Sequence, residues 1–213
     1  MLRSASLLLV LLVLLVLLVS ATAEAQTGIP DLNQSTLERD DAGPSALSIM
    51  VVPDGSGPPL TQAVRPDGTI ASAGLTATVR DGANFPVANF PFEDLWLESF
   101  DGDLAPCIGG TTADANTDIN GQTRFETPLR AGGWTEGPLL LMLNGMAIVG
   151  SEVAIRINSP DSNGDGAVNM TDLATFAADY HGAYHFRSDF NFDGSIDLGD
   201  VVILAAKLGV SCP

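Results

Sequence analysis

The stretch DSNGDGAVNMTD, residues 161–172, places three aspartates, two asparagines and two glycines within twelve positions. Acidity alone is typical of many solvated loops, so the spacing of these residues has to separate an ordinary loop from a cation site. With Asp161 as position 1, carboxylate or amide side chains fall at positions 1, 3, 5, 9 and 12, and Gly166 stands at position 6. In order, these side chains belong to Asp161, Asn163, Asp165, Asn169 and Asp172.

This spacing matches the ligand positions of a calcium-binding EF-hand loop. Calcium takes about six to eight oxygen ligands, and such a loop supplies them from positions 1, 3, 5, 7, 9 and 12. Position 7 contributes only its backbone carbonyl, so Ala167 is acceptable there. Position 6 needs a sharp turn, which glycine adopts without a clash at Cβ. The stretch therefore predicts one calcium ion.

The same pattern returns 28 residues later as DFNFDGSIDLGD, residues 189–200. Gly194 takes position 6, and Ser195 offers its carbonyl at position 7. The remaining predicted ligands are Asp189, Asn191, Asp193, Asp197 and Asp200. An acidic composition alone would not reproduce these positions, so we expect two calcium ions, one in each loop.

An apolar pattern with helical spacing follows each loop. The four positions after loop one have the i, i+3, i+4, i+7 spacing of one helical face and recur after loop two. They are Leu173, Phe176, Ala177 and Tyr180, matched by Val201, Leu204, Ala205 and Leu208. Val168 and Ile196 occupy position 8, where paired EF-hand loops form a short two-stranded ladder. Because calcium would offset the carboxylate repulsion, we predict helices in calcium and disorder in chelator.

These paired loops resemble a dockerin module, here from Asp161 to about Gly209. Dockerins are duplicated loop-plus-helix units without full entering helices, and the proline before Asp161 leaves no room for one. The resemblance implies attachment to a cohesin-like or other surface protein in an extracellular assembly. Dockerins recognise their partner through the residues that follow the ligand at position 9, which are often a Ser-Thr pair. Met170–Thr171 and Leu198–Gly199 stand there instead, which departs from the cellulosomal pattern.

Residues 46–158 show short apolar stretches separated by turn residues. Val153, Ile155 and Ile157 alternate with other residues, the period-two pattern of a half-buried strand. Turn residues recur at intervals of about eight to twelve positions, which favours an antiparallel sandwich. The predicted fold is mainly β: an antiparallel immunoglobulin-like sandwich at 46–158, followed by a small α-helical paired EF-hand (dockerin-like) module at 159–213.

The sandwich region also resembles the bacterial immunoglobulin-like repeats of surface adhesins. The match covers about half of the region. It rests on Val79, Asp81, Pro86, Val87, Thr117, Gly121, Thr123 and Phe125. Such domains are spacers and binding surfaces, so the resemblance implies no catalytic chemistry.

The chain start and the overall charge indicate where the protein works. Arg3, an apolar run at 7–19 and small residues near 23–25 predict a signal peptide at 1–25. Residues 26–45 are polar and read as a flexible lead-in. The mature chain is then expected to be secreted or at the cell surface, without a membrane span. A net charge of −17 disfavours nucleic acid as a partner and favours cations.

No arrangement of residues predicts an enzyme. His181 and His185 have the spacing of zinc ligands on a helix, but they lie between the calcium loops without an accompanying glutamate. We expect a secreted, non-catalytic calcium-binding protein whose module attaches it to another protein. The alternative is an accessory component of a bacterial polysaccharide-degrading complex, with glycan bound at Trp96 or Trp134.

One further alternative concerns the two cysteines. The module has a third possible role, which is to stabilise the end of the sandwich and bind no partner. A disulfide between Cys107 and Cys212 would support that role. Whether these cysteines pair is left open by the sequence.

Overall fold

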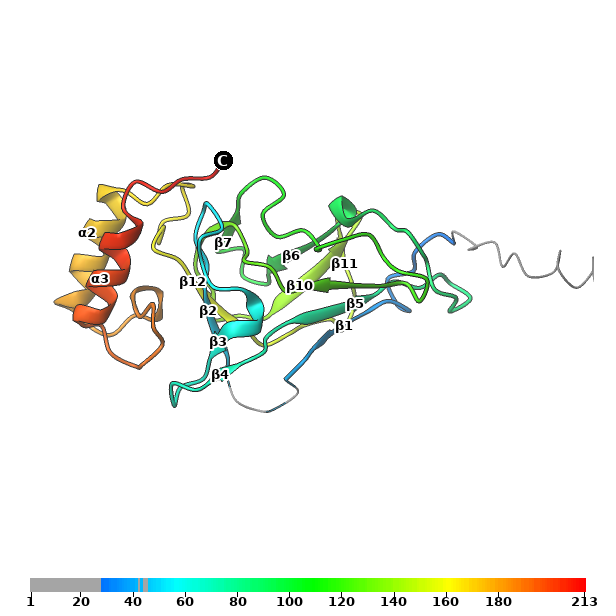
Figure 1. Ribbon diagram of the computed structural model, residues 1–213, viewed down its shortest axis with the longest axis horizontal. Helices are drawn as coiled ribbons and strands as arrows, with labels where there is room; N and C mark the ends of the chain where they lie inside the picture. Colours follow the sequence, from blue (N-terminus) through cyan, green and yellow to red (C-terminus); the bar gives the residue numbers. More distant parts are fainter. Residues whose placement is uncertain (1–27, 42, 44–45) are drawn as a thin grey trace, which may run out of the picture.

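The structure, a computed structural model, describes residues 28–213 apart from residues 42, 44 and 45 (Figure 1). The expected signal peptide at 1–25 lies outside the described residues. None of the helices in the described part is long and apolar enough to cross a membrane.

The described chain is mainly β, with antiparallel strand pairs and two α-helices near its end. Two three-stranded sheets form much of the β body, in the orders β1-β5-β8 and β11-β10-β6. Their strands are β1 (Thr36–Arg39), β5 (Leu75–Thr78), β8 (Gln122–Phe125), β6 (Leu95–Ser99), β10 (Leu139–Leu143) and β11 (Met146–Ala147). Short 3-10 turns, η1 (Leu60–Gln62) and η2 (Phe92–Asp94), lie in the connections.

Two further sheets form the end of the β body that lies nearest the helices. A four-stranded sheet has the order β12-β2-β3-β4, and β7 pairs with β9. These strands are β12 (Arg156–Asn158), β2 (Ser48–Met50), β3 (Ala63–Val64), β4 (Ile70–Ala71), β7 (Leu104–Pro106) and β9 (Ala131–Gly133). The β12–β2 pair is parallel, which corrects the expectation of a wholly antiparallel sandwich. Because the whole β region separates the two strands, the connection is long enough for a parallel pair.

The core follows from alternation along the strands. In β10, Leu139, Leu141 and Leu143 are buried, and the residues between them are partly exposed. The antiparallel β6–β10 pair sets Leu97 opposite Leu141. These residues join one continuous apolar cluster that also contains Leu75, Phe125 and Ile157. The period-two patterning therefore places one apolar face of each strand inside the β body.

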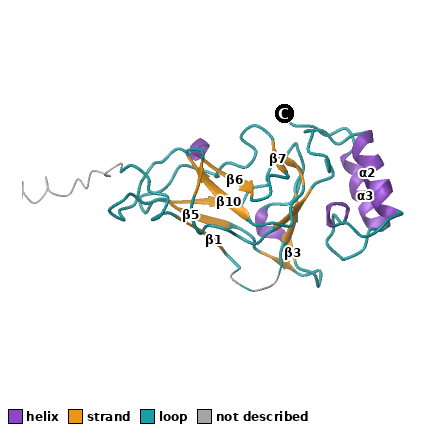
Figure 2. Ribbon diagram, turned by 180° about the vertical axis from the view of Figure 1, so that it is seen from behind, coloured by secondary structure: helices purple, strands orange, loops and turns teal. Residues whose placement is uncertain are grey.

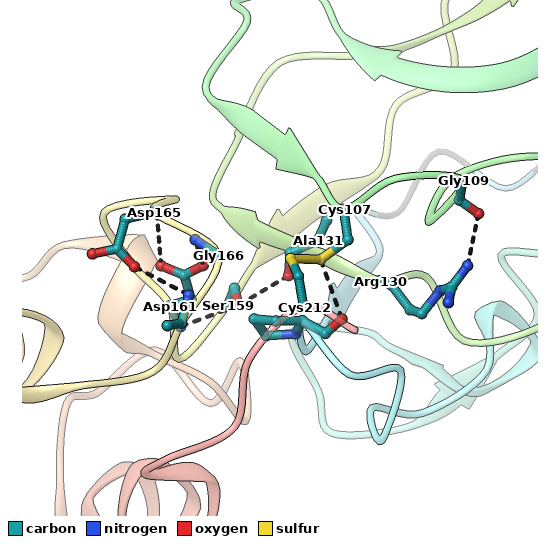
Figure 3. The surroundings of a disulfide bond; sticks show 11 residues. Cys107, Gly109, Arg130, Ala131, Ser159, Asp161, Asp165, Gly166 and Cys212 are labelled. Carbon is teal, nitrogen blue, oxygen red and sulfur yellow. Dashed lines mark hydrogen bonds between the residues drawn. A yellow bond between two sulfur atoms is a disulfide. The ribbon is translucent and has the colours of Figure 1, made fainter.

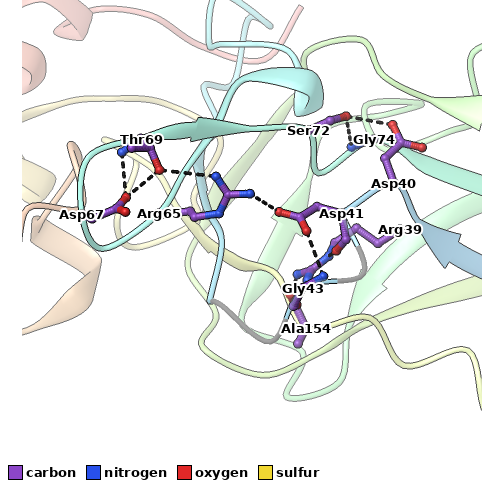
Figure 4. A network of polar contacts seen from close by, with 10 residues as sticks. All are labelled: Arg39, Asp40, Asp41, Gly43, Arg65, Asp67, Thr69, Ser72, Gly74 and Ala154. Atoms are coloured by element: carbon purple, nitrogen blue, oxygen red, sulfur yellow. Dashed lines mark hydrogen bonds and ion pairs between the residues drawn. The ribbon is translucent and has the colours of Figure 1, made fainter.

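The lead-in expected to be flexible contributes a strand. Thr36–Arg39 forms β1, which pairs with β5, and Leu37 is buried opposite Ala77. Polar contacts are formed at the end of β1 and just after it (Figure 4): Asp41 forms an ion pair with Arg65, and Arg39 donates a hydrogen bond to the Gly43 carbonyl over 2.9 Å. The burial of Leu37 and the pairing with β5 explain why residues 36–39 form a strand despite their polar surroundings in the sequence.

The α-helices lie at one end of the molecule (Figures 1 and 2), beside β12 and β2 (Figure 1). The structure forms α2 (Met170–Tyr180), the short 3-10 turn η3 (Phe186–Ser188) and α3 (Leu198–Lys207). Phe176 and Phe190 stack with ring centroids 5.9 Å apart, and with Val168 and Leu204 they form a small second core. Met50 of β2 packs against this core, so the helices and the β body share an apolar contact.

Candidate metal centre

Loop one folds around two buried carboxylates at its first and last positions. Asp161 accepts hydrogen bonds from the backbone N–H of Asp165 (3.2 Å) and of Gly166 (2.8 Å). Asp172 accepts from the backbone N–H of Asn163 (3.2 Å) and of Asn169 (2.9 Å). These bonds draw positions 1, 3, 5, 6, 9 and 12 into one compact loop.

The side chains at positions 3, 5 and 9 of loop one converge. The amide nitrogens of Asn163 and Asn169 lie 3.1 and 3.3 Å from the same oxygen of Asp165, Oδ2. The side-chain amide of Asn169 also donates to the Ala167 carbonyl, the expected ligand at position 7, over 3.1 Å. The structure therefore brings the polar groups of positions 3, 5, 7 and 9 together.

Loop two repeats the contacts of positions 1, 3, 5 and 12, whereas the side chain at position 9 is Asp197, a carboxylate that cannot donate as Asn169 does. Asp189 accepts from the backbone N–H of Asp193 (3.1 Å) and of Gly194 (2.9 Å). Asp200 accepts from Asn191 and Asp197, over 3.4 and 3.0 Å. The Asn191 side chain donates to Asp193 over 2.7 Å, and the Ser195 N–H donates to the same carboxylate over 3.0 Å. Two different sequences thus fold into the same loop.

The glycines at position 6 have the backbone conformation that the loop requires. Gly166 has φ of 87° and Gly194 has φ of 86°. Residues with a Cβ rarely adopt this left-handed region, so each loop depends on glycine there. The conformation turns the N–H of each glycine toward the carboxylate at position 1.

Positions 9 and 12 also begin the helices. Asn169 is the N-cap of α2 and accepts from the Thr171 N–H over 2.8 Å, while Asp172 closes the capping box at position N3. Asp197 and Asp200 do the same for α3. These residues therefore stabilise the helix starts directly, whether or not a cation is bound.

The charge balance inside the loops is unfavourable for the bare protein. Asp161 and Asp189 are both 0% exposed, and among the described residues neither forms an ion pair with a Lys, Arg or His side chain. Burial raises the pKa of Asp161, and the nearby negative charges of Asp172 and Asp165 raise it further. Burial likewise raises the pKa of Asp200. A buried carboxylate ordinarily has a cationic partner or a metal.

Within the part of the chain that the structure describes, no three His, Cys, Asp or Glu side chains are grouped to hold a metal ion. In both loops the carboxylates at positions 1 and 12 accept hydrogen bonds from backbone N–H groups. Amides and a carbonyl supply several of the other predicted ligands. The donor set contains only oxygen ligands of the kind that calcium prefers, so the residues fit calcium by chemistry. The two-ion assignment stays a prediction.

The expected ladder between the two loops is wrong for Val168. Its N–H donates to the Val210 carbonyl over 2.8 Å, and its carbonyl accepts from the Gly209 N–H over 2.9 Å. Ala167 forms an isolated bridge with Ser211 in the same short pairing. Ile196 packs against the small core instead. Residues 209–211 pair with loop one at this position, because the disulfide at Cys212 holds them beside it.

That disulfide joins Cys107, just after β7, to Cys212, with their Cα atoms 5.6 Å apart (Figure 3). It settles the pairing that the sequence left open. Disulfides of this kind persist in oxidising compartments. The bond ties the residues after α3 to the β body.

Several residues beside the loops carried no signal in the sequence. The Tyr184 hydroxyl donates to Asp189 over 2.8 Å; burial and this hydrogen bond raise the pKa of Tyr184. The buried Asn158 side chain donates to the Asp189 carbonyl over 2.5 Å. Arg187 forms a bidentate pair with Asp179, at 2.8 and 2.9 Å. The Asn158–Asp189 contact joins residues 31 positions apart, so it depends on the tertiary fold, whereas the contacts of Tyr184 and Arg187 lie within the connection between the two loops.

The outer face of the helix pair is apolar and exposed. A shallow cavity of about 220 Å³ lies between α2 and α3, lined by Leu173, Tyr180, Val201 and Leu208 among others. Met170 and Leu198, which hold position 10 of their loops, are 71% and 70% exposed. Val202 is 67% exposed. Exposed apolar side chains on a helix pair are typical of protein interaction surfaces.

A separate groove of about 610 Å³ lies on the β body, where Trp96 and Phe92 line it together with Glu93 and Arg130. Trp96 is half-buried on the outward side of β6, and its indole N–H donates to Glu98 over 2.8 Å. Trp96 is therefore not a core residue.

No protein-family model matches this chain, and no curated protein matches it significantly. Among solved structures, the Lin-41 filamin domain is 14% identical, with 61% of this chain and 96% of that chain covered and a TM-score of 0.29. A type II cohesin–X-dockerin complex from Acetivibrio cellulolyticus, carrying an N-terminal interface mutation, is 18% identical. It covers 55% of this chain and 82% of that chain, with a TM-score of 0.23. Both likenesses are too low to assign a family, so function has to be argued from the residues themselves.

Proposed function

We propose that residues 159–213 bind two calcium ions and that the helix pair they order attaches this secreted, non-catalytic protein to a partner protein. The observation that carries the proposal is the repeated loop geometry. Both loops hold buried carboxylates at positions 1 and 12, with polar groups at positions 3 and 5 turned toward each other. Calcium supplies the positive charge that these buried carboxylates lack among the described residues.

Calcium acts here as a structural ion. In loop one, Asp161, Asn163, Asp165, Asn169 and Asp172 would hold it with the Ala167 carbonyl; in loop two, Asp189, Asn191, Asp193, Asp197 and Asp200 would do so with the Ser195 carbonyl. Binding adds to stability, because the ion binds the folded loop far better than the unfolded chain. At about one hundred times its dissociation constant, each ion would add about 2.7 kcal/mol.

Calorimetric titration of the oxidised, chelator-treated protein tests calcium binding. We expect two ions per chain, with one lost in Asp161→Asn and the other lost in Asp189→Asn. Asp103→Asn is a charge-matched control, because Asp103 is exposed and lies outside both loops. A helical circular-dichroism signal that is the same in calcium and in chelator would contradict the ordering role.

Attachment is tested on the exposed apolar face. Met170 and Leu198 stand at equivalent positions of the two repeats, so a partner can read the same pattern twice. We expect binding to an immobilised cohesin in calcium, and its loss in M170E/L198E, which keeps all the predicted calcium ligands. If the wild-type chain is not retained in calcium, the partner is not a cohesin.

The disulfide favours a second candidate, in which the module stabilises the end of the sandwich and binds no partner. Cys107–Cys212 and the packing of Met50 against the helical core join the two parts. In that case calcium would raise the unfolding temperature of the β body, which Trp96 and Trp134 report. M170E/L198E would leave this increase unchanged.

The glycan alternative depends on the Trp96 groove. Aromatic rings beside carboxylate and guanidinium groups suit sugar recognition, and Phe92, Trp96 and Arg130 provide this chemistry. Retention on insoluble polysaccharide, abolished by Trp96→Ala, would support an accessory role in polysaccharide breakdown. Wild-type protein that washes through the same polysaccharide would exclude it.

A further inference from the structure

Loop one is enclosed by parts of the protein that lie far away in sequence. On one side it meets β9 of the β body, and on the other it meets residues 209–212, called the tail segment below. Figure 3 shows Asp161, Asp165 and Gly166 beside the disulfide that joins the tail segment to the β body.

The β body holds the start of the loop. The Gly133 N–H donates to the Asp161 carbonyl over 2.6 Å. A Cβ added at Gly132 would lie 2.0 Å from the Asp161 carboxylate, so the absence of a side chain there makes room for this ligand. The Ser159 hydroxyl, which accepts from the Asp161 N–H over 3.2 Å, itself donates to the Ala131 carbonyl.

The tail segment holds the middle of the loop. The Cys212 N–H donates to the Gly166 carbonyl over 2.8 Å, and the tail segment pairs with Val168 in both directions. The position of a Cβ at Gly166 is only 3.3 Å from Cys212 Sγ. The disulfide sulfur therefore packs directly against the turn at position 6.

Loop two has a different environment at the same position. A Cβ at Gly194 would meet no atom within 4 Å. Two side chains of β12 hold it to the β body: Asn158 donates to the Asp189 carbonyl at position 1, and the Arg156 guanidinium lies over the Phe192 ring. The two loops thus share the hydrogen bonds to the carboxylates at positions 1 and 12 but differ in what holds them from outside.

We propose that the Cys107–Cys212 disulfide is a positioning element of the loop-one calcium site and raises its affinity, while loop two binds calcium independently of it. This inference rests on the calcium binding proposed above. The disulfide fixes the tail segment against loop one, so less freedom is lost when calcium orders the loop. By thermodynamic linkage, calcium at loop one must disfavour reduction of the disulfide by the same factor.

The test compares calcium titrations of the oxidised wild-type chain and of C107S/C212S, each also carrying Asp189→Asn so that only loop one is measured. The expected effect is a loss of affinity of about tenfold. The same pair of cysteine states with Asp161→Asn in place of Asp189→Asn reports loop two, whose affinity should not change. Near-ultraviolet circular dichroism of the tryptophans checks that the β body is folded in every variant.

A second measurement covers the case in which C107S/C212S does not fold. The Asp189→Asn chain is equilibrated with reduced and oxidised dithiothreitol, so that the protein disulfide becomes two thiols as dithiothreitol closes its own disulfide. The reduced fraction is measured in calcium and in chelator. We expect calcium to shift this equilibrium about tenfold toward the protein disulfide, and to cause no shift when Asp161→Asn is added.

The outcomes separate the two proposals. If the oxidised wild-type chain binds no calcium, the proposed function fails and this inference fails with it. If it binds two ions but loop one has the same calcium affinity with and without the disulfide, only the coupling is overturned. The same holds if calcium does not shift the thiol–disulfide exchange equilibrium. Equal losses at both loops would also overturn it, because a general loss of stability would then explain the result.

Discussion

Replacing Gly132 by alanine tests how closely the β body fits against loop one. The new Cβ would lie 2.0 Å from Asp161 Oδ2 and 2.6 Å from its Cγ, and ordinary contact begins at 3.4 Å. The carboxylate oxygen would have to move by roughly 1.4 Å, which breaks its 2.8 Å hydrogen bond from the Gly166 N–H.

The cost has two parts that overlap. A hydrogen bond to a charged group contributes about 1.5–3 kcal/mol, and forcing an extra methyl group into a packed site costs about 1–3 kcal/mol. We therefore expect Gly132→Ala to lower the free energy of unfolding of the helical part by about 2–4 kcal/mol. Because Asp161 is position 1 of loop one, calcium binding at that loop should weaken as well.

Denaturant unfolding followed at 222 nm in calcium measures the stability, and calorimetric titration measures the affinity. Gly82→Ala is the control: its Cβ would meet only Asp31, at 3.5 Å, which is an ordinary contact. We expect a change within about 0.5 kcal/mol there. The reasoning is refuted if Gly132→Ala matches the Gly82→Ala control in both stability and calcium affinity.

Three further predictions concern the helical part. Phe176→Ala removes a buried ring stacked on Phe190 and should cost about 3–5 kcal/mol in denaturant unfolding, whereas the exposed Val202→Ala should cost little. Asp179→Asn removes the negative charge and one of the two oxygens that accept from Arg187, and should cost about 1–3 kcal/mol, measured by thermal unfolding at pH 7. Burial raises the pKa of Asp179, but the hydrogen bonds from Arg187 and Ser188 outweigh it, so the folded pKa lies below the ordinary value of 3.8. The stabilisation from the ionised Asp179 is therefore present above pH 3.8 and is lost as the pH falls through the lower folded pKa. Unfolding scans from pH 6 to pH 2 should show this loss in the wild-type chain and not in Asp179→Asn.

The internal structure of the two loops was the most predictable part of the molecule. Position 1, position 6 and position 12 lie within twelve residues of each other, so the chain has few ways to bring them together. Gly166 and Gly194 adopt the left-handed conformation expected of position 6, and the carboxylates of Asp172 and Asp200 close their loops. Short-range geometry of this kind is encoded by spacing alone.

The surroundings of the loops were not predictable in the same way. Val168 and Ile196 had equivalent positions in the repeat, yet Val168 pairs with the tail segment because Cys212 is bonded to a residue 105 positions earlier. β1 forms because Leu37 finds an apolar site opposite Ala77, a contact between distant stretches. The parallel β12–β2 pair likewise depends on the order of the whole β body. No local pattern specifies which distant segments meet.

The Cys107–Cys212 bond also determines how the molecule responds to being pulled. Tension applied after Cys212 passes through the sulfur atoms into the backbone at Cys107, so the covalently closed segment between them bears no load. That segment includes both helices and both loops. At about 3.3–3.6 Å per extended residue, the bond withholds roughly 350–380 Å of chain from extension. Tension applied after Cys212 would therefore stretch the strands before Cys107 and leave the helix pair unloaded.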